Sequence, residues 1–176
     1  MKKFLTCIAL VISMLMAASK AEAQTAYGGF QLTASTLVGN YHFNQTNFLS
    51  MGPEVSFRYS IPIQPHYNAA MVTGINAFWV RPLKTNKDLY TIGILVGIDA
   101  GWNRFRLTPY INGNLLFTSK VGFLPYVGCD FRYSITPLID IGANGSYCLQ
   151  AIGTSETIKY KGALSLYFNV GSTPQK

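Results

Sequence analysis

The chain has 176 residues, enough for one domain, and only 12% of them are charged, about half the usual share. Aromatic residues reach 14% and hydrophobic residues 49%, with a formal net charge of +7. This balance is typical of a membrane or secreted β protein rather than a cytosolic one. The basic residues are scattered along the chain, which argues against a nucleic-acid-binding protein.

The first 23 residues form a separate unit. Lys2 and Lys3 precede an apolar run over residues 4–18, and Ala21-Glu22-Ala23 has the small-x-small form of a cleavage site before Gln24. The pattern predicts a cleaved signal peptide over 1–23; the alternative is an uncleaved anchor, for which the run is short of the ~20 residues a span needs. No later stretch approaches ~18 consecutive apolar residues, so we expect no transmembrane helix.

Residues 24–170 alternate between apolar and polar side chains with a period of two, which indicates strands. In the segment before Pro62, Val55, Phe57, Tyr59 and Ile61 share one face. The same alternation predicts eight strands, at residues 27–38, 51–61, 66–80, 89–100, 104–117, 123–135, 138–148 and 157–170. Pro109, within the fifth strand, predicts a bulge there. Leu95 and Leu116 depart from the alternation.

The expected connections alternate in length. Short ones follow the second, fourth and sixth strands (62–65, 101–103 and 136–137), and longer ones follow the first, third, fifth and seventh (39–50, 81–88, 118–122 and 149–156). This arrangement is typical of an even-numbered outer-membrane barrel. The pentapeptide FRYSI occurs at 57–61 and 131–135, each time just before a short turn, which predicts Tyr59 and Tyr133 at the periplasmic interface. The alternatives are coincidence between similar environments and an old hairpin duplication.

Charged residues occupy the strand positions that alternate with the apolar ones, and they indicate which face of the sheet forms the core. They are Glu54, Arg58, Asp99, Arg106, Asp130, Arg132, Asp140 and Lys161, four acids and four bases. A soluble barrel would turn them to solvent and would have to pack many aromatic rings into its narrow interior. A membrane barrel turns the apolar face outward, and its balanced interior charges must be paired. We therefore expect a filled, charge-paired lumen, to which Tyr110, Tyr126 and Tyr167 contribute; a proton or ion path is the alternative.

With these features the chain resembles the small eight-stranded outer-membrane barrels of the OmpA and OmpX type. In style it is similar to the "outer membrane protein beta-barrel domain" chains of Bacteroidota, which often open with Gln after the cleaved Ala, as at Ala23-Gln24. The resemblance implies an all-β, antiparallel, up-and-down transmembrane barrel over 24–170 in the outer membrane of a Gram-negative bacterium. It also implies insertion by the barrel-assembly machinery. One departure is that such barrels often end on an aromatic residue, whereas here a tail of six residues, 171–176, follows Val170.

The predicted outer loops carry a basic cluster of Arg81, Lys84 and Lys87, with Lys120 in the next loop. These residues would face the phosphates of lipopolysaccharide, or else they form a solvated basic surface. The first long loop, with Tyr41, Phe43 and Phe48, is the candidate contact surface for an unidentified surface or envelope protein; these aromatics could equally belong to the outer girdle.

The sequence shows no motif for a catalytic, metal or cofactor site, and no cofactor is expected. His42 and His66 should lie at opposite ends of the barrel and so cannot share a metal. The strand register places Cys129 near Gly145 and Cys148 near Tyr126, on opposite faces, which predicts two free thiols.

We expect a non-catalytic, integral outer-membrane barrel with a structural or surface-interaction role. The alternatives are a lipid-A-modifying barrel enzyme that uses His42 with Ser50 and Glu54, a small ion channel, an accessory barrel of a secretion or conjugation assembly, and a soluble periplasmic ligand-binding barrel. The last would have the reverse polarity, with the apolar face lining a cavity.

Overall fold

The computed structural model describes residues 29–63, 69–83, 85–102, 104–118, 120–136 and 138–170. The predicted signal peptide, the tail after Val170, His66 and Lys84 lie outside the described residues. Eight strands make up the fold: β1 (Gly29–Phe43), β2 (Thr46–Pro62), β3 (Ala69–Pro82), β4 (Leu89–Trp102), β5 (Phe105–Phe117), β6 (Val121–Thr136), β7 (Ile139–Cys148) and β8 (Thr157–Val170). Within the described residues, no helix has the length and hydropathy needed to cross a membrane.

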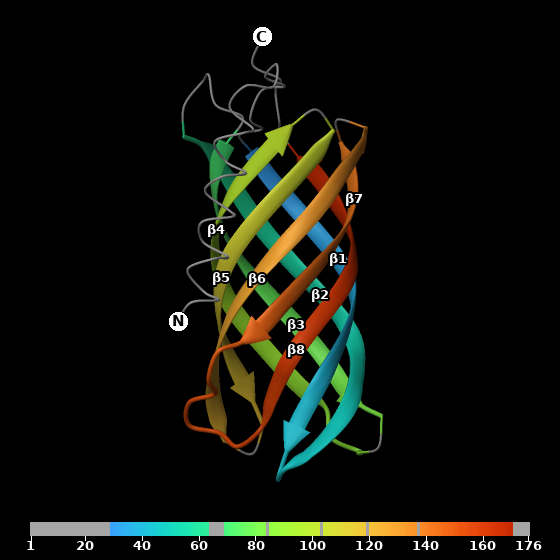
Figure 1. Ribbon diagram of the computed structural model, residues 1–176, viewed down its shortest axis with the longest axis vertical. Coiled ribbons are helices and arrows are strands. Elements are labelled where there is room, and N and C mark those ends of the chain that lie inside the picture. The colour runs from blue at the N-terminus through green and yellow to red at the C-terminus, as the bar shows by residue number, and fades with distance from the viewer. Residues whose placement is uncertain are drawn as a thin grey trace, which may run out of the picture.

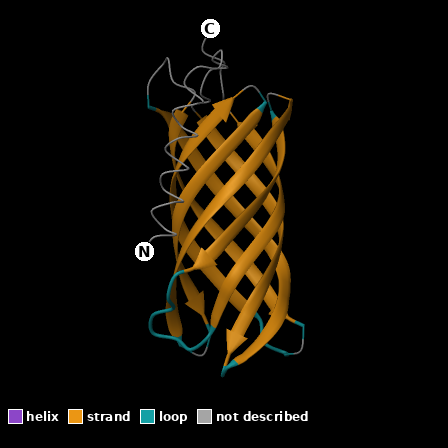
Figure 2. Ribbon diagram, viewed as in Figure 1, coloured by secondary structure: helices purple, strands orange, loops and turns teal. Residues whose placement is uncertain are grey.

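The strands close into an antiparallel barrel in chain order, with β1 also paired to β8 (Figures 1 and 2). Gly29 and Val170 lie at one end of the barrel, here called the termini end, which is uppermost in Figure 1. The β1–β2 turn and the connections at 83–88, 118–120 and 149–156 lie at the other, the loop end. The predicted all-β, eight-stranded, up-and-down barrel is confirmed.

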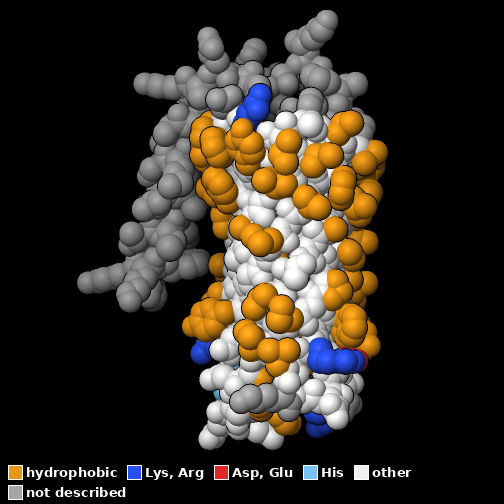
Figure 3. Space-filling view, turned by 90° about the vertical axis from the view of Figure 1, so that its right-hand side faces the viewer, with side chains coloured by type: hydrophobic (Ala, Val, Ile, Leu, Met, Phe, Trp, Pro, Cys, Tyr) orange, Lys and Arg blue, Asp and Glu red, His pale blue; other side chains and the backbone are white. Residues whose placement is uncertain are grey.

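The outer wall of the barrel is apolar. Large side chains on the outward parity are well exposed, for example Ile94 at 64%, Ile111 at 66% and Leu164 at 74%. Figure 3 shows one face of this wall, with hydrophobic side chains spread along it and basic side chains only near its two ends. In a protein surrounded by water, so much contiguous apolar surface would be costly.

Aromatic rings gather on the outside of both ends. At the termini end, Phe30 contacts Tyr59 with ring centroids 4.8 Å apart, and Phe105 contacts Tyr133 at 5.1 Å. At the loop end, Trp79 stacks on Tyr90 at 6.3 Å. Rings at two levels are what a barrel needs at two membrane interfaces. Both FRYSI copies lie at the termini end, on β2 and β6.

The first connection is not the long loop that the sequence predicts. β1 and β2 continue to Phe43 and Thr46, and only Asn44 and Gln45 turn the chain, with φ of 48° and 64°. Two consecutive residues with positive φ are the requirement of a tight hairpin turn. The prediction of long connections at this end is therefore wrong for the first hairpin, and the polar sequence around 39–50 is strand.

Two other irregularities differ from expectation. No bulge forms at Pro109, which pairs with Cys129 in an unshifted register. On the other side of β5, the ladder to β4 has no pairs between Gly97–Tyr110 and Ala100–Leu107, consistent with the missing proline N–H. The register instead shifts at Asn40/Tyr41, opposite β8, and at Ser134/Thr136, opposite β7.

Candidate functional site

The barrel interior is the site that the sequence singles out. All eight charged residues predicted to face it do so, and none is more than 9% exposed. They are Glu54, Arg58, Asp99, Arg106, Asp130, Arg132, Asp140 and Lys161. Because neighbouring strands present alternate residues inward, charges from six strands meet in one enclosed volume.

Asp99 is the centre of the group nearest the termini end. Its Oδ2 lies 2.6 Å from an Arg106 nitrogen and its Oδ1 lies 2.5 Å from Arg132 Nη2. The Thr108 hydroxyl donates to the same Oδ1 at 2.8 Å. Arg132 also reaches Asp140, at 3.8 Å. One carboxylate that accepts from two guanidinium groups and a hydroxyl satisfies the requirement that buried charges be paired.

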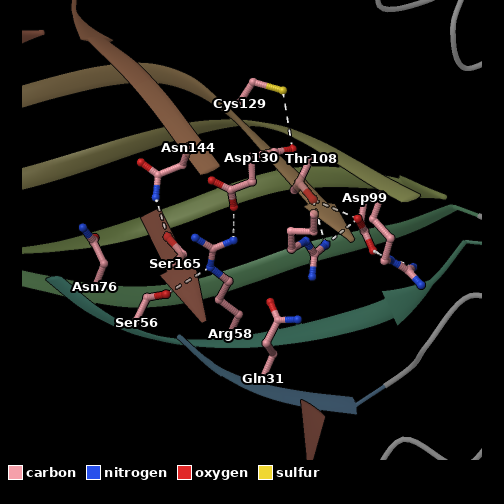
Figure 4. A network of polar contacts seen from close by, with 12 residues as sticks. Gln31, Ser56, Arg58, Asn76, Asp99, Thr108, Cys129, Asp130, Asn144 and Ser165 are labelled. Atoms are coloured by element: carbon pink, nitrogen blue, oxygen red, sulfur yellow. Dashed lines mark hydrogen bonds and ion pairs between the residues drawn. The ribbon is translucent and has the colours of Figure 1, made fainter. Parts of the chain in front are cut away.

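The FRYSI repeat places an arginine in this interior from each of two strands. Arg58, from β2, forms an ion pair with Asp130 of β6 (Figure 4). The guanidinium carbons of Arg58 and Arg132 lie 5.7 Å and 5.2 Å from the centroid of the Tyr167 ring. β2 and β6 are four strands apart in an eight-stranded order, so the two arginines enter from opposite sides and share one aromatic ring.

Lys161 marks the boundary between the charged part of the lumen and an apolar part. Its Nζ lies 2.9 Å from Glu54 Oε1, which also accepts from Asn76 Nδ2 at 3.2 Å. The same Nζ lies 4.4 Å from the Phe78 ring centroid and 5.1 Å from that of Tyr126. The ammonium group is thus held between a carboxylate and two ring faces.

Toward the loop end, the interior is filled by an apolar cluster that the sequence did not predict. Its members come from all strands except β2: Leu37, Tyr41, Phe78, Val80, Leu89, Leu116, Leu124, Tyr126, Cys148, Ile158 and Ala163. Leu116 is completely buried here, and Leu95 is buried in a smaller interior cluster with Val72 and Tyr110. These two leucines were the departures from alternation, and they were the available signal that part of the lumen is apolar.

The aromatics assigned to the first loop belong to this cluster. Tyr41 is fully buried, and its hydroxyl donates to Glu156 Oε2 at 3.0 Å. Phe43 and Phe48 are partly buried against the cluster. Tyr41 is therefore not part of the predicted contact surface, and the assignment of the three aromatics to the outer girdle is wrong, since their rings pack at the inside of the loop end. The contact surface stays a prediction for the partly exposed Phe43 and Phe48.

The basic residues of the loop end are largely paired within the chain. Arg81 donates twice to Asp88, at 2.7 Å and 2.9 Å. These hydrogen bonds lower the pKa of Asp88 below its ordinary value. Lys87 lies 3.2 Å from Glu156 and 4.6 Å from the Phe43 ring centroid. Lys87 and Lys120 both line a pocket of about 480 Å³ at this end.

His42, Ser50 and Glu54 do not form a catalytic group. The His42 ring contacts Asn47 at 3.0 Å, the Ser50 hydroxyl donates to the Gly39 carbonyl at 3.0 Å, and Glu54 is paired with Lys161. In the part of the chain that the structure describes, no three His, Cys, Asp or Glu side chains are grouped to hold a metal ion.

The register of the two cysteines is as predicted. Cys129 pairs with Gly145, and Tyr126 pairs with Cys148. Both thiols are free, with Cys148 buried and Cys129 partly exposed.

Comparison with known proteins identifies the fold. No protein-family description matches the sequence. Nor does any curated protein. Among solved structures, Neisserial surface protein A matches with a TM-score of 0.53 and 15% identity, over 79% of this chain and 94% of that one. Ail, the attachment invasion locus protein of Yersinia pestis, matches with a TM-score of 0.53 and 12% identity, over 81% of this chain and 97% of that one. At these identities the likeness concerns the fold: this chain has the eight-stranded barrel architecture of the small outer-membrane barrels.

Proposed function

We propose that this protein is an integral barrel of a Gram-negative outer membrane, with a structural or surface-interaction role and no catalytic activity. The observation that carries the proposal is the polarity of the wall. Exposed aliphatic and aromatic side chains cover the outside, whereas the eight charged side chains are buried inside and joined by ion pairs. A barrel in water has the opposite polarity, and a barrel in lipid has this one.

The filled interior favours a structural role over conduction. The apolar cluster occupies the lumen toward the loop end, and the paired charges occupy the lumen toward the termini end. Ions crossing such an interior would have to displace apolar side chains and break buried pairs, and both are costly. The same contacts rigidify the barrel, which suits a protein that strengthens the envelope or presents its loops to a partner.

The loop end is proposed to face outward, because outer-membrane barrels keep both chain termini on the periplasmic side. Lys87 and Lys120 would then lie at the level of lipopolysaccharide phosphates. Arg81 contributes less than its charge suggests, since Asp88 already neutralises it. Insertion would follow the usual route through the barrel-assembly machinery.

The test combines fractionation with an SDS gel of boiled and unboiled membrane samples. A membrane barrel stays folded in unheated SDS, so we expect outer-membrane material whose migration changes on boiling. Protein that is found in the soluble periplasm and shows no heat-dependent shift would overturn the proposal. Cells that express the His42→Ala variant test the enzyme alternative. Loss of lipid A modification in these cells would establish catalysis, whereas normal modification would favour a structural barrel.

A further inference from the structure

The barrel wall has a local gap near the loop end, where β7 and β8 separate. Their last register pair is Tyr147–Tyr160. Beyond it, the chain follows β6: the Leu149 N–H donates to the Pro125 carbonyl at 2.8 Å, and Ile152 bridges to Phe123. Figure 1 shows β7 ending nearer the middle of the barrel than the point where β8 begins, with the connecting loop running away from β8 before it returns. Residues 157–159 of β8 therefore have no partner in β7.

A pocket of about 370 Å³ occupies this gap. Its polar lining includes Asn40, His42, Asn47, Gln150, Lys159 and Tyr160. These residues come from β1, β2, β8 and the 149–156 connection, so the pocket is built by closure of the barrel rather than by one hairpin.

A bulge places Lys159 at this pocket. Asn40 pairs with Tyr160 and Tyr41 pairs with Ile158, so Lys159 is an extra residue in β8. Without the bulge, strict alternation would turn the residue before the outward-facing Tyr160 into the lumen. The bulge lets Ile158 fill the apolar cluster while Lys159 and Tyr160 both point outward. Re-aiming a side chain is a recurrent use of β-bulges.

The pocket has two polar groups, the Lys159 ammonium and Asn40 Oδ1, that the described residues leave without a partner. Lys159 forms no ion pair with any acidic side chain in the described ranges, whereas Arg81 and Lys87 are each paired. The Oδ1 atom of Asn40 is buried and accepts no hydrogen bond from the described residues. A cation and a buried acceptor that line the same pocket suit a ligand that carries both a phosphate and a hydroxyl group.

The wall next to the pocket, toward the middle of the barrel, suits an acyl chain. Tyr147 and Tyr160 contact each other there, with centroids 5.1 Å apart. On the termini-end side of this ring pair, Gly145 pairs with Gly162. A Cβ built on Gly145 meets no heavy atom within 4 Å, so the wall is low and open at that point. The exposed Leu164 follows on β8.

We propose that this gap binds one lipid A molecule of the surrounding leaflet. The Lys159 ammonium donates to a lipid A phosphate, the Asn40 carbonyl oxygen accepts from a sugar hydroxyl, and one acyl chain lies over Gly145 and Gly162. Tyr147 and Tyr160 would lie at headgroup level, with Lys159 on their loop-end side. The phosphate of a membrane lipid lies at this level, next to interfacial aromatic residues. The inference rests on the proposed membrane position and concerns a site separate from Lys87 and Lys120.

The test is binding of lipid A to the folded barrel in phosphatidylcholine nanodiscs, with bound lipid counted by native mass spectrometry. Lys159→Gln should weaken retention of one lipid A molecule about tenfold, the usual effect of losing a charge-assisted hydrogen bond. Lys159→Arg should keep it. Arg104→Gln, which removes an exposed basic side chain at the termini end, is the charge-matched control and should bind as the wild type does.

Gly145→Leu probes the chain-binding part of the site without touching the headgroup residues. The open space at Gly145 lets the barrel fold, so weaker lipid A retention is expected from the filled groove alone. Inorganic phosphate should not displace lipid A; full displacement by phosphate would mean an anion site rather than a lipid site and would overturn the inference.

Equal retention by wild type and Lys159→Gln, in samples that show a normal heat-dependent gel shift, would also overturn it and leave the proposed membrane role intact. Failure of the wild type to insert into nanodiscs, with no gel shift, would overturn both.

Discussion

At the residue scale, the pair of Arg58 and Asp130 joins strands on opposite sides of the lumen, and both side chains are almost completely buried. We expect Asp130→Asn to lower the free energy of unfolding by about 3–5 kcal/mol, because it leaves a guanidinium buried without its counter-charge. Urea titration in phospholipid vesicles, followed by the fluorescence of Trp79 and Trp102, measures the change.

The double variant Arg58→Met with Asp130→Leu should recover most of that loss, since replacing a buried pair by apolar residues is often neutral. Asp88→Asn breaks an exposed pair and serves as the control, with unfolding close to wild type. Additive losses in the Arg58 and Asp130 double variant would contradict a direct pairing.

Asp88 lies outside the barrel wall, and its carboxyl group makes the stability of the protein depend on pH. Hydrogen bonds from Arg81 lower its pKa in the folded protein, so the folded state binds this proton less readily than the unfolded chain. Their stabilising effect is therefore present above the ordinary carboxyl pKa and is lost as the pH falls through the lowered one. A carboxyl-carbon NMR titration should show the pKa of Asp88 rising toward its ordinary value in Arg81→Gln; equal titration curves would show that Arg81 has no such effect.

At the scale of the element, β5 presents two adjacent leucines to opposite environments. Leu116 is fully buried in the apolar cluster, whereas Leu115 is 43% exposed on the outer wall. Leu116→Ala should cost about 2–5 kcal/mol of unfolding free energy, because it leaves a cavity in a packed interior. Leu115→Ala should cost less than about 1 kcal/mol, since lipid replaces the lost contacts. Similar losses from both, in the same vesicle assay, would mean that the lumen near Leu116 is hydrated.

The element scale also explains where strand prediction from sequence succeeds. Alternation is a local property, so it placed β4 to β8 within a few residues of their observed bounds and assigned the inward parity of residues such as Asp130 and Tyr167. It failed around Asn44 and Gln45, because a two-residue turn with positive φ can be formed by residues that also fit a loop. Strict alternation would turn Lys159 into the lumen, whereas the bulge turns it outward, because a bulge depends on what the partner strand opposes.

At the scale of the whole molecule, closure of the barrel decides whether the lumen conducts. The apolar cluster and the paired charges fill successive parts of one interior. We expect no steady conductance when the folded protein is inserted into planar bilayers, with insertion confirmed by the heat-dependent gel shift of the same preparation. Reproducible stepwise currents from that preparation would contradict a filled lumen.

The amino-acid sequence by itself determined the class of fold, the inside-out polarity and the identity of the eight inward charges, because each follows from a period of two along the chain. Only the tertiary structure decided which charges meet. Arg58 finds Asp130, and Arg132 finds Asp99, through register and closure, which no local pattern encodes. Closure also decided that Tyr41, Phe43 and Leu116 pack inside the loop end, since an apolar residue on the inward parity is favourable only where other apolar residues meet it across the lumen.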